Sequence, residues 1–257
     1  MYLFSELQEK EKNNDRIRVC LIGAGKFGSM FLSQVTTTPG LEVARIADLD
    51  PARAKLTCKS VGWNDDQLGT VDFTDDALRA IQYGDFDVIV EATGHPPSGI
   101  KHAREAFKMG KHIIMVNVEA DVLAGPLLAK EAASAGVVYS MAYGDQPALT
   151  CELVDWARSC GFHVTAAGKG TKYLPHYHLS TPDTVWNHYG ISHEEAAEAG
   201  MNSKMFNSFL DGTKSALEMA AIANACNLAP PNNGLKFPPC GMNDLAHVLR
   251  PISEGGQ

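Results

Sequence analysis

Short apolar runs alternate with segments of helical character over the first 142 residues, and this alternation restricts the possible fold more than any other feature. The runs are rich in Val, Ile and Leu, which is typical of strands buried on both faces. Parallel strands need crossover connections, so the alternation predicts right-handed βαβ units and an α/β fold with a doubly wound parallel sheet. We expect strands at 17–22, 41–47, 88–91, 111–116 and 137–141. We expect helices at 1–16, 29–36, 51–61, 99–109 and 124–135.

A glycine pattern, G-x-G-x-x-G, follows the first expected strand and opens a helix. In a dinucleotide-binding turn, the first glycine permits the tight turn, the second admits a pyrophosphate and the third lets helix and strand pack closely. The helix N-terminus adds free N–H groups and a partial positive charge. The motif predicts a Rossmann domain that binds NAD or NADP through Gly23, Gly25, Lys26, Phe27 and Gly28. The alternative is a glycine-rich turn that binds no nucleotide.

An acidic residue, Asp48, ends the second expected strand, 48 − 28 = 20 residues after the last glycine. A carboxylate at this place binds the adenine-ribose hydroxyls of NAD and repels the additional phosphate of NADP. Arg53 lies nearby and could hold that phosphate, so the sequence leans only slightly towards NAD. The alternative role for Asp48 is a helix cap before Pro51.

Polar residues also follow the third and fourth of these strands. The carboxyl ends of parallel strands form the ligand crevice of a doubly wound sheet. Thr93 and Gly94 are therefore expected beside the nicotinamide ribose, with Asn117 and Glu119 on the same rim. His95 is a weaker candidate there.

The pattern changes near residue 143. We expect helices at 149–160 and 202–227, a strand at 162–168, and a proline-rich and glycine-rich tail from 228. No strands that would complete a second sheet are visible, so we expect a partial α+β catalytic and dimerisation domain. The expected domains are an N-terminal helix at 1–16, the Rossmann domain at 17–142 and the catalytic domain at 143–257.

Composition excludes several classes of protein. The net charge is −8, and a chain without a basic run is a poor candidate for binding nucleic acid. No apolar stretch reaches the length of about 18 residues that a membrane span needs. The six cysteines include no C-x-x-C pair and are expected to be reduced, as in the cytoplasm.

Five segments together resemble a known group of enzymes: VCLIGAGKFGSMFLSQ, DVIVEATG, IIMVNVEADVLAGP, AYGDQPA and GKGTKYLPHYH. They are similar to the homoserine-dehydrogenase-like oxidoreductases, and most of all to the DXR-like (DRL) branch. The resemblance covers roughly residues 15–250. It implies NADPH-dependent conversion of 1-deoxy-D-xylulose 5-phosphate to 2-C-methyl-D-erythritol 4-phosphate, or oxidoisomerisation of a sugar acid. Members of the branch continue to a C-terminal SAF domain, so the resemblance also implies that the chain is truncated.

The chain departs from the homoserine dehydrogenases at two places. Those enzymes carry Asn-Lys-Ala after the fourth strand, whereas this chain has Val118 and Glu119 after Asn117. They also carry an Asp and a Lys four residues apart on a helix, where this chain has Lys214 and Glu218 with the charges exchanged. Homoserine is therefore a poor substrate, and a phosphorylated or polyhydroxylated carbonyl compound fits better.

Reduction of a carbonyl needs a group that polarises its oxygen, and isomerisation also needs an acid or base and a positive charge for an enediolate. Lys169 and Lys172 could supply positive charge, and the alternative is two solvated lysines. Lys214 lies one helical turn from Glu218, and the alternative is a surface ion pair. Asp145 could accept a substrate hydroxyl or act as a base, and the alternative is a turn residue. With Glu119, these residues form the predicted catalytic set.

Two histidines, His176 and His178, would point the same way on a strand and could share a divalent ion. The nearest carboxylates in the sequence are Asp183 and Glu194. An H-x-H without a fixed third ligand favours an ordinary loop, so no metal ligand is assigned. A divalent ion stays open as a cofactor because reductoisomerases outside this branch use one.

The function expected is that of an NAD(P)-dependent oxidoreductase acting on a small sugar phosphate or sugar acid. A DXR-like reductoisomerase comes first, a sugar-acid oxidoisomerase second and a homoserine-dehydrogenase-type enzyme third. A nucleotide-binding redox sensor without catalysis is the alternative from another class. The resemblance implies a homodimer, and the composition predicts a cytoplasmic protein that binds neither nucleic acid nor a membrane.

Overall fold

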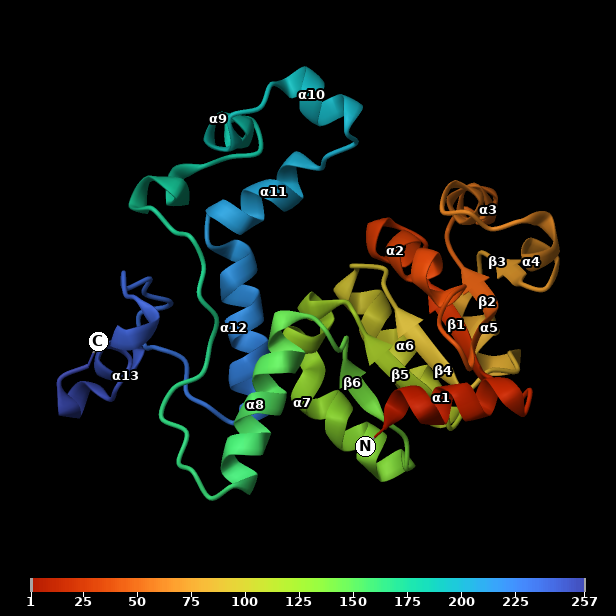
Figure 1. Cartoon of the computed structure of the whole chain (residues 1–257), viewed down its shortest axis with the longest axis horizontal. Helices are drawn as coiled ribbons and strands as arrows, with labels where there is room; N and C mark the ends of the chain where they lie inside the picture. The colour runs from red at the N-terminus through yellow and green to blue at the C-terminus, as the bar shows by residue number, and fades with distance from the viewer. Residues whose placement is uncertain (1, 257) are drawn as a thin grey trace. The chain divides into compact units, whose positions relative to one another are not determined.

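The computed structural model describes residues 2–256. The chain divides into two compact units, Met1–Tyr143 and Gly144–Gln257 (Figure 1). The division into functional domains at 1–16, 17–142 and 143–257 stays a prediction. No helix among residues 2–256 is long and apolar enough to cross a membrane.

The first unit is built on a six-stranded sheet in which every pair of neighbouring strands is parallel. Its strand order is β3-β2-β1-β4-β5-β6. The first three strands extend from β1 towards one edge of the sheet, and the last three extend from β4, beside β1, towards the other edge. The reversal of strand order lies between β1 and β4, which is where doubly wound sheets bind ligands. The strands are β1 Ile17–Ile22, β2 Leu41–Ala47, β3 Asp72–Thr74, β4 Val88–Glu91, β5 His112–Met115 and β6 Tyr139–Met141.

Helices cover both faces of this sheet. Cys20 and Ile22 of β1 enter one apolar cluster with residues of α5, α6 and α7, while Val19 and Leu21 enter another with residues of α2 and α3. The continuous apolar run at 19–22 of β1 follows from this burial, because side chains alternate between the two faces. The helices are α1 Leu3–Lys12, α2 Lys26–Val35, α3 Pro51–Ser60, α4 Asp65–Gly69, α5 Ala77–Tyr83, α6 Pro96–Lys108 and α7 Val118–Ala135.

The α/β fold and all five predicted strands of the first unit are confirmed, with end shifts of at most two residues. The elements between 65 and 83 escaped prediction because β3 has only three residues and shows no periodicity. Helix α7 begins at Val118 instead of 124. The reason is a helix cap, since the side chain of Asn117 accepts a hydrogen bond from the Ala120 N–H at 3.2 Å.

The second unit consists of helices and irregular segments, without a strand in residues 144–256, where a partial α+β domain was expected. The strand predicted at 162–168 is wrong: this segment is irregular, and Val164 and Ala167 pack against an apolar cluster of Val154, Ile222 and Cys226. A strand needs a partner for its backbone groups, and residues 144–256 contain none. The elements are α8 Gln146–Ser159, η1 Pro175–Leu179, α9 Val185–Tyr189, α10 His193–Glu198, α11 Ser203–Leu210, α12 Thr213–Cys226, η2 Met242–Asp244, α13 Leu245–Val248 and η3 Ile252–Glu254.

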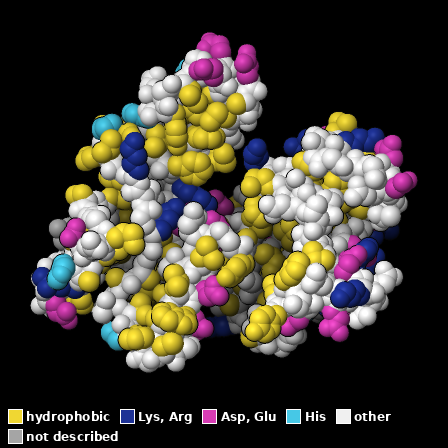
Figure 2. Space-filling view, viewed as in Figure 1, with side chains coloured by type: hydrophobic (Ala, Val, Ile, Leu, Met, Phe, Trp, Pro, Cys, Tyr) yellow, Lys and Arg dark blue, Asp and Glu magenta, His cyan; other side chains and the backbone are white. Residues whose placement is uncertain are grey.

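The helical region predicted at 202–227 is two helices with a break. Gly212 has φ +93°, a left-handed conformation that favours glycine. Asp211 Oδ1 accepts a hydrogen bond from the Thr213 N–H at 2.8 Å, which satisfies a backbone donor at the start of α12. Hydrophobic side chains gather on the surface over α11 (Figure 2), among them the part-exposed Met205 and Phe209.

Candidate functional site

The glycine turn between β1 and α2 has the backbone geometry that its first residue requires. Gly23 has φ +95°, and a Cβ there would lie 2.7 Å from the carbonyl oxygen of Ala92, just after β4. A side chain at this position would therefore meet both backbone strain and a steric conflict. The turn can pass close to the end of β4 only because residue 23 is glycine.

The second and third glycines have different surroundings. A Cβ on Gly25 would meet no heavy atom within 4 Å, whereas a Cβ on Gly28 would lie 2.4 Å from the carbonyl oxygen of Gly23. Gly25 is the N-cap of α2, and the first turn of this helix, which includes Lys26 and Phe27, contains no acidic residue. The free space at Gly25 and the unopposed helix N-terminus fit a pyrophosphate group.

Asp48 lies at the end of β2 with its side chain only 4% exposed. Its Oδ2 accepts a hydrogen bond from the Ala24 N–H at 2.8 Å, and its Oδ1 accepts from the Asp50 N–H at 3.0 Å and from Arg53 Nη2 at 2.8 Å. Burial opposes ionisation, but the hydrogen bonds from Asp50, Arg53 and Ala24 outweigh it and hold the pKa of Asp48 below its usual value. Asp48 does not cap the following helix. Asp50 does so, because its side chain accepts a hydrogen bond from the Arg53 N–H.

A buried polar network that the sequence did not reveal lies after β4. Glu91, with no exposed surface, accepts a hydrogen bond from the Thr93 hydroxyl at 2.6 Å and contacts His102 Nδ1 of α6 at 3.1 Å. Asn117 Nδ2 reaches Thr93 Oγ1 at 3.5 Å, so two predicted rim residues belong to one network. A carboxylate inside an apolar strand, eleven residues before a histidine on the next helix, was the available signal.

The other predicted rim residues have less defined surroundings. Gly94 has φ +66°, and a Cβ there would meet no atom within 4 Å. His95 is the N-cap of α6, and its Nδ1 lies 2.8 Å from Ser98 Oγ. Glu119 lies in the first turn of α7, where a carboxylate stabilises the helix N-terminus.

A pocket in the second unit brings together four of the six predicted catalytic residues. Its volume is about 340 Å³, and it contains Asp145, Lys169, Lys214 and Glu218. These residues come from the N-terminus of α8, the irregular segment after it and the first two turns of α12. The remaining lining residues, which the sequence did not single out, are Gln146, Thr171, Phe209 and Ser215.

Glu218 holds the two lysines of this pocket. Its side chain is 1% exposed; Lys169 forms an ion pair with Oε2, and Lys214 Nζ lies 3.4 Å from Oε1. A buried carboxylate is stable when opposite charges compensate it, so Glu218 fixes both ammonium groups at the pocket wall. The predicted alternative of a surface pair is wrong for Glu218, since this carboxylate is buried.

Burial and neighbouring charges act on Lys169 in addition to its ion pair with Glu218. Burial, followed by the charge of Lys214, lowers the pKa of Lys169, and the carboxylate of Asp145 opposes this effect. A lysine with a lowered pKa in a pocket is a candidate acid or base. Asp145 also caps α8, and its Oδ1 accepts a hydrogen bond from the Gln146 N–H at 3.0 Å.

Two members of the predicted catalytic set do not line this pocket. Lys172 is exposed, three residues after Lys169 in a segment without regular structure. Glu119 belongs to the first unit. The sequence placed both lysines in one loop but could not tell which of them faces inward.

The two histidines are not on a strand, so the less favoured alternative, in which both point the same way along a strand, does not occur. His176 and His178 lie in η1, where His178 Nδ1 donates a hydrogen bond to the Asp211 carbonyl oxygen at 2.8 Å. The ring of His176 lies 5.7 Å from that of His188. Within residues 2–256, no three His, Cys, Asp or Glu side chains are grouped as a metal site would require. Asp183 and Glu194 therefore complete no such site.

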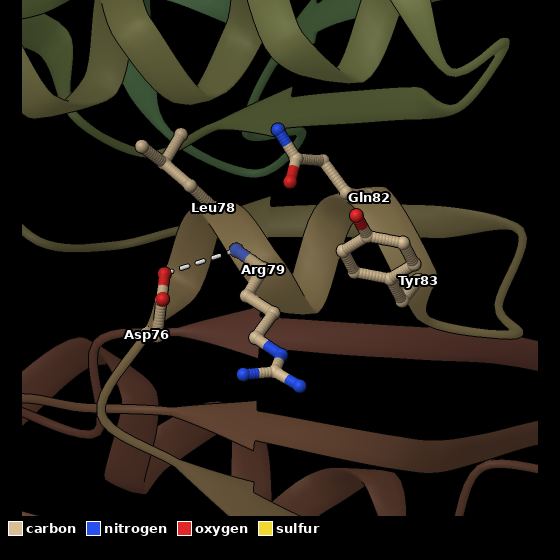
Figure 3. A pocket seen from close by; sticks show the side chains of 5 residues that line it. All are labelled: Asp76, Leu78, Arg79, Gln82 and Tyr83. Carbon is tan, nitrogen blue, oxygen red and sulfur yellow. Dashed lines mark hydrogen bonds between the residues drawn. The ribbon is translucent and has the colours of Figure 1, made fainter.

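A second hollow, of about 510 Å³, lies on α5 of the first unit (Figure 3). Asp76 caps this helix by accepting a hydrogen bond from the Arg79 N–H at 3.0 Å, the dashed line in the figure. Gln82 is engaged with Glu105 of α6 at 2.8 Å. The hollow contains none of the residues that the sequence predicted for catalysis, so the pocket of the second unit is the better candidate site.

Comparison with solved structures finds three dehydrogenases of low sequence identity, of which only the first, the homoserine dehydrogenase, supports the fold. A homoserine dehydrogenase from Thiobacillus denitrificans is 14% identical, with 84% of this chain and 50% of that chain covered and a TM-score of 0.58. The WlbA dehydrogenase from Bordetella pertussis, in complex with NADH and UDP-GlcNAcA, is 20% identical over 57% and 42% of the chains, with a TM-score of 0.44. Scyllo-inositol dehydrogenase from Lactobacillus casei, with NAD(H) and scyllo-inositol, is 16% identical over 56% and 42%, with a TM-score of 0.41. This chain spans half or less of the length of these structures.

A search of the curated proteins finds no significant match. Two family models match successive parts of the chain, and both describe oxidoreductases, as the sequence predicted. Residues 17–119 match the oxidoreductase family with an NAD-binding Rossmann fold, called GFO/IDH/MocA. Residues 144–257, which contain the lysine and carboxylate pocket, match the catalytic domain of the oxidoreductase DRL.

Proposed function

We propose that this chain carries the cofactor-binding and substrate-binding parts of an NAD(P)-dependent oxidoreductase. The substrate is a small phosphorylated or polyhydroxylated carbonyl compound, with 1-deoxy-D-xylulose 5-phosphate as first choice. One observation carries the proposal: Lys169, Lys214, Glu218 and Asp145 line one pocket, within residues that match the DRL catalytic domain. The glycine turn, within residues that match an NAD-binding family, supplies the cofactor site.

The pocket has the groups that carbonyl reduction needs. A bound nicotinamide supplies or accepts the hydride in such a reaction. Lys214 polarises the carbonyl oxygen, and Lys169, with its lowered pKa, gives a proton to the oxygen that becomes a hydroxyl. Glu218 holds both ammonium groups in place, which limits the reorganisation needed during the reaction.

Rearrangement of a sugar phosphate makes further demands. A hydroxyl group must lose a proton as a C–C bond breaks, and the resulting enediolate needs nearby positive charge. Asp145 is the proposed base for this proton, and the two lysines hold the enediolate oxygens. No step of this scheme needs a metal ligand from the chain.

The cofactor is proposed to be NAD or NADP, and Asp48 and Arg53 are proposed to determine which of the two binds more tightly. The ionised Asp48 favours the free ribose hydroxyls of NAD. Arg53 is more than half exposed and can turn towards a ribose phosphate, which favours NADP as the family resemblance does. The resemblance also supports a homodimer.

Oxidoisomerisation of a sugar acid is the second candidate. Two lysines anchored on one carboxylate suit a substrate carboxylate as well as a phosphate. Homoserine fits less well because Lys214 and Glu218 exchange the charges that homoserine dehydrogenases carry at these positions. A redox sensor without catalysis would have no need of such a pocket.

The test follows the absorbance of NADPH after addition of 1-deoxy-D-xylulose 5-phosphate and a magnesium or manganese salt. Fluorescence of NADPH in the same sample reports binding of the cofactor. Consumption that depends on the sugar phosphate supports the first candidate, and consumption only with sugar acids supports the second. The assay is repeated with the uninterrupted gene product. If both proteins bind the cofactor but neither consumes NADPH with the sugar phosphate or with sugar acids, the catalytic proposal is overturned. Lys169→Met tests the role of the pocket lysine in this consumption. Lys172→Met is its matched control, because Lys172 lies outside the pocket.

A further inference from the structure

Two cysteine side chains meet between α8 and α12. Cys226 Sγ donates a hydrogen bond to Cys151 Sγ at a distance of 3.5 Å, across 75 residues of sequence. Cys226 is the last residue of α12 and is 5% exposed, whereas Cys151 lies in the second turn of α8 and is half-buried. Spacing alone could not pair these residues, since they lie far apart in the sequence and belong to no C-x-x-C motif.

The surroundings of this pair hold it in place. Cys151 and Cys226 belong to the apolar cluster formed with Val154 of α8 and Ile222 of α12. Arg158 of α8 donates a hydrogen bond from Nη1 to the Cys226 carbonyl oxygen at 2.8 Å, which fixes the end of α12 against α8. The two sulfur atoms are therefore kept close by packing on both sides.

We propose that Cys151 and Cys226 form a reversible disulfide when the protein meets hydrogen peroxide. The half-buried Cys151 reacts first. Its sulfur attacks the peroxide, an S–O bond forms, the O–O bond breaks and one water leaves. The sulfur of Cys226 then attacks Cys151 Sγ, the S–S bond forms, the S–O bond breaks and a second water leaves with the thiol proton. Two thiols are oxidised by two electrons, and the peroxide is reduced.

Two of the other thiols, Cys20 and Cys58, are less suited to this reaction. Burial raises the pKa of Cys20 to about 12 and that of Cys58 to about 11, which leaves both almost fully protonated at neutral pH. Cys160 and Cys240 are exposed, and peroxide can reach them. They serve as internal references for thiol reactivity in the same chain.

The disulfide would join the two helices that carry the pocket. Asp145 and Gln146 lie at the start of α8, and Lys214 and Glu218 lie in the first two turns of α12. A covalent bond between these helices restricts their sliding against each other, and therefore any change in the spacing of pocket residues. The inference stands without the proposed substrate, because it depends only on the two sulfur atoms.

The test treats the native chain with peroxide, alkylates it after denaturation and maps the peptides by mass spectrometry. We expect one cross-linked pair of peptides containing Cys151 and Cys226, lighter by two hydrogens and lost on reduction with dithiothreitol. The thermal midpoint of the oxidised chain should rise and return on reduction. Cys160 lies at the C-terminal end of α8, the helix that contains Cys151, so Cys160→Ser is the matched control and should keep the cross-link. Cys226→Ser should lose it.

Two outcomes would overturn the proposal. In one, Cys160 and Cys240 are oxidised while Cys151 and Cys226 remain open to alkylation. In the other, Cys151 is oxidised to a sulfinic acid without a cross-link. Both can be read from the wild-type chain, so they do not depend on whether a variant folds.

Discussion

The glycine turn allows the effect of a side chain on folding to be separated from its effect on cofactor binding. Replacing Gly23 by Ala places a residue with a Cβ at φ +95° and 2.7 Å from the Ala92 carbonyl oxygen. The left-handed conformation costs about 1–2 kcal/mol and the overpacking about 1–3 kcal/mol. The free energy of unfolding should therefore fall by about 2–5 kcal/mol.

Replacing Gly25 by Ala should have the opposite balance of effects. No heavy atom lies within 4 Å of its Cβ, so the expected loss of stability is that of a poorer N-cap, at most about 1 kcal/mol. The new methyl group occupies the space through which a pyrophosphate would approach the backbone. Binding of NADH should weaken at least tenfold, which is about 1.4 kcal/mol.

The assays are urea unfolding for stability and NADH fluorescence titration for affinity. Gly69→Ala is the control, since Gly69 also has no atom within 4 Å of its Cβ and lies in α4, away from the turn. It should leave NADH affinity unchanged. Unchanged NADH affinity in Gly25→Ala would refute the cofactor site, and wild-type stability in Gly23→Ala would refute the steric argument.

Three further changes test single side chains. Asp48→Ala should weaken NADH binding more than NADPH binding in parallel titrations, because it removes the ribose acceptor, and equal losses would contradict that role. Lys214→Met should lower kcat at least tenfold and leave cofactor affinity nearly unchanged, as a pocket residue requires; loss of cofactor binding would move Lys214 out of the substrate site. The hydrogen bond from Arg16, then that from the Gly40 N–H, lowers the pKa of Glu11 from 4.5 to about 2, so ionised Glu11 stabilises the fold above pH 4.5. This contribution declines as the pH falls towards 2 and is lost below it, so urea unfolding should find Glu11→Gln less stable than wild type at pH 7 and the difference much smaller at pH 2.

The sequence predicted the parts of the fold where one strong local signal acts. The run 17–22 is apolar except for Arg18, and a strand covered on both faces buries its last four residues. The segment 162–168 also contains apolar residues, but Val164 and Ala167 pack on helices, a tertiary effect that the local pattern does not contain. The start of α7 was mispredicted because it depends on a side-chain cap at Asn117, which the spacing of apolar residues does not reveal.

The candidate site was predictable to a similar degree. Lys214 and Glu218 are one turn apart on a helix, so their proximity followed from spacing alone. That Lys169 joins them, and that Lys172 does not, depends on how an irregular segment crosses α12. The pairing of Glu91 with His102 could not be predicted from the sequence either, because the strand and the helix come together only in the folded structure.

The hydrogen bonds at Asp48 have a consequence for how a ribose would be recognised. An ionised carboxylate has about four acceptor sites. Among the described residues, the N–H groups of Ala24 and Asp50 and the guanidinium of Arg53 occupy three of them. A ribose diol brings two hydroxyl donors. One of them can use the remaining acceptor site of Asp48, and the other must displace one of the three donors already bound to this carboxylate. The two backbone donors are fixed by the turn and the strand end, which leaves the exposed Arg53 as the group that exchanges. Arg53 would therefore leave Asp48 when an unphosphorylated ribose binds, and would turn towards the phosphate when a phosphorylated ribose binds.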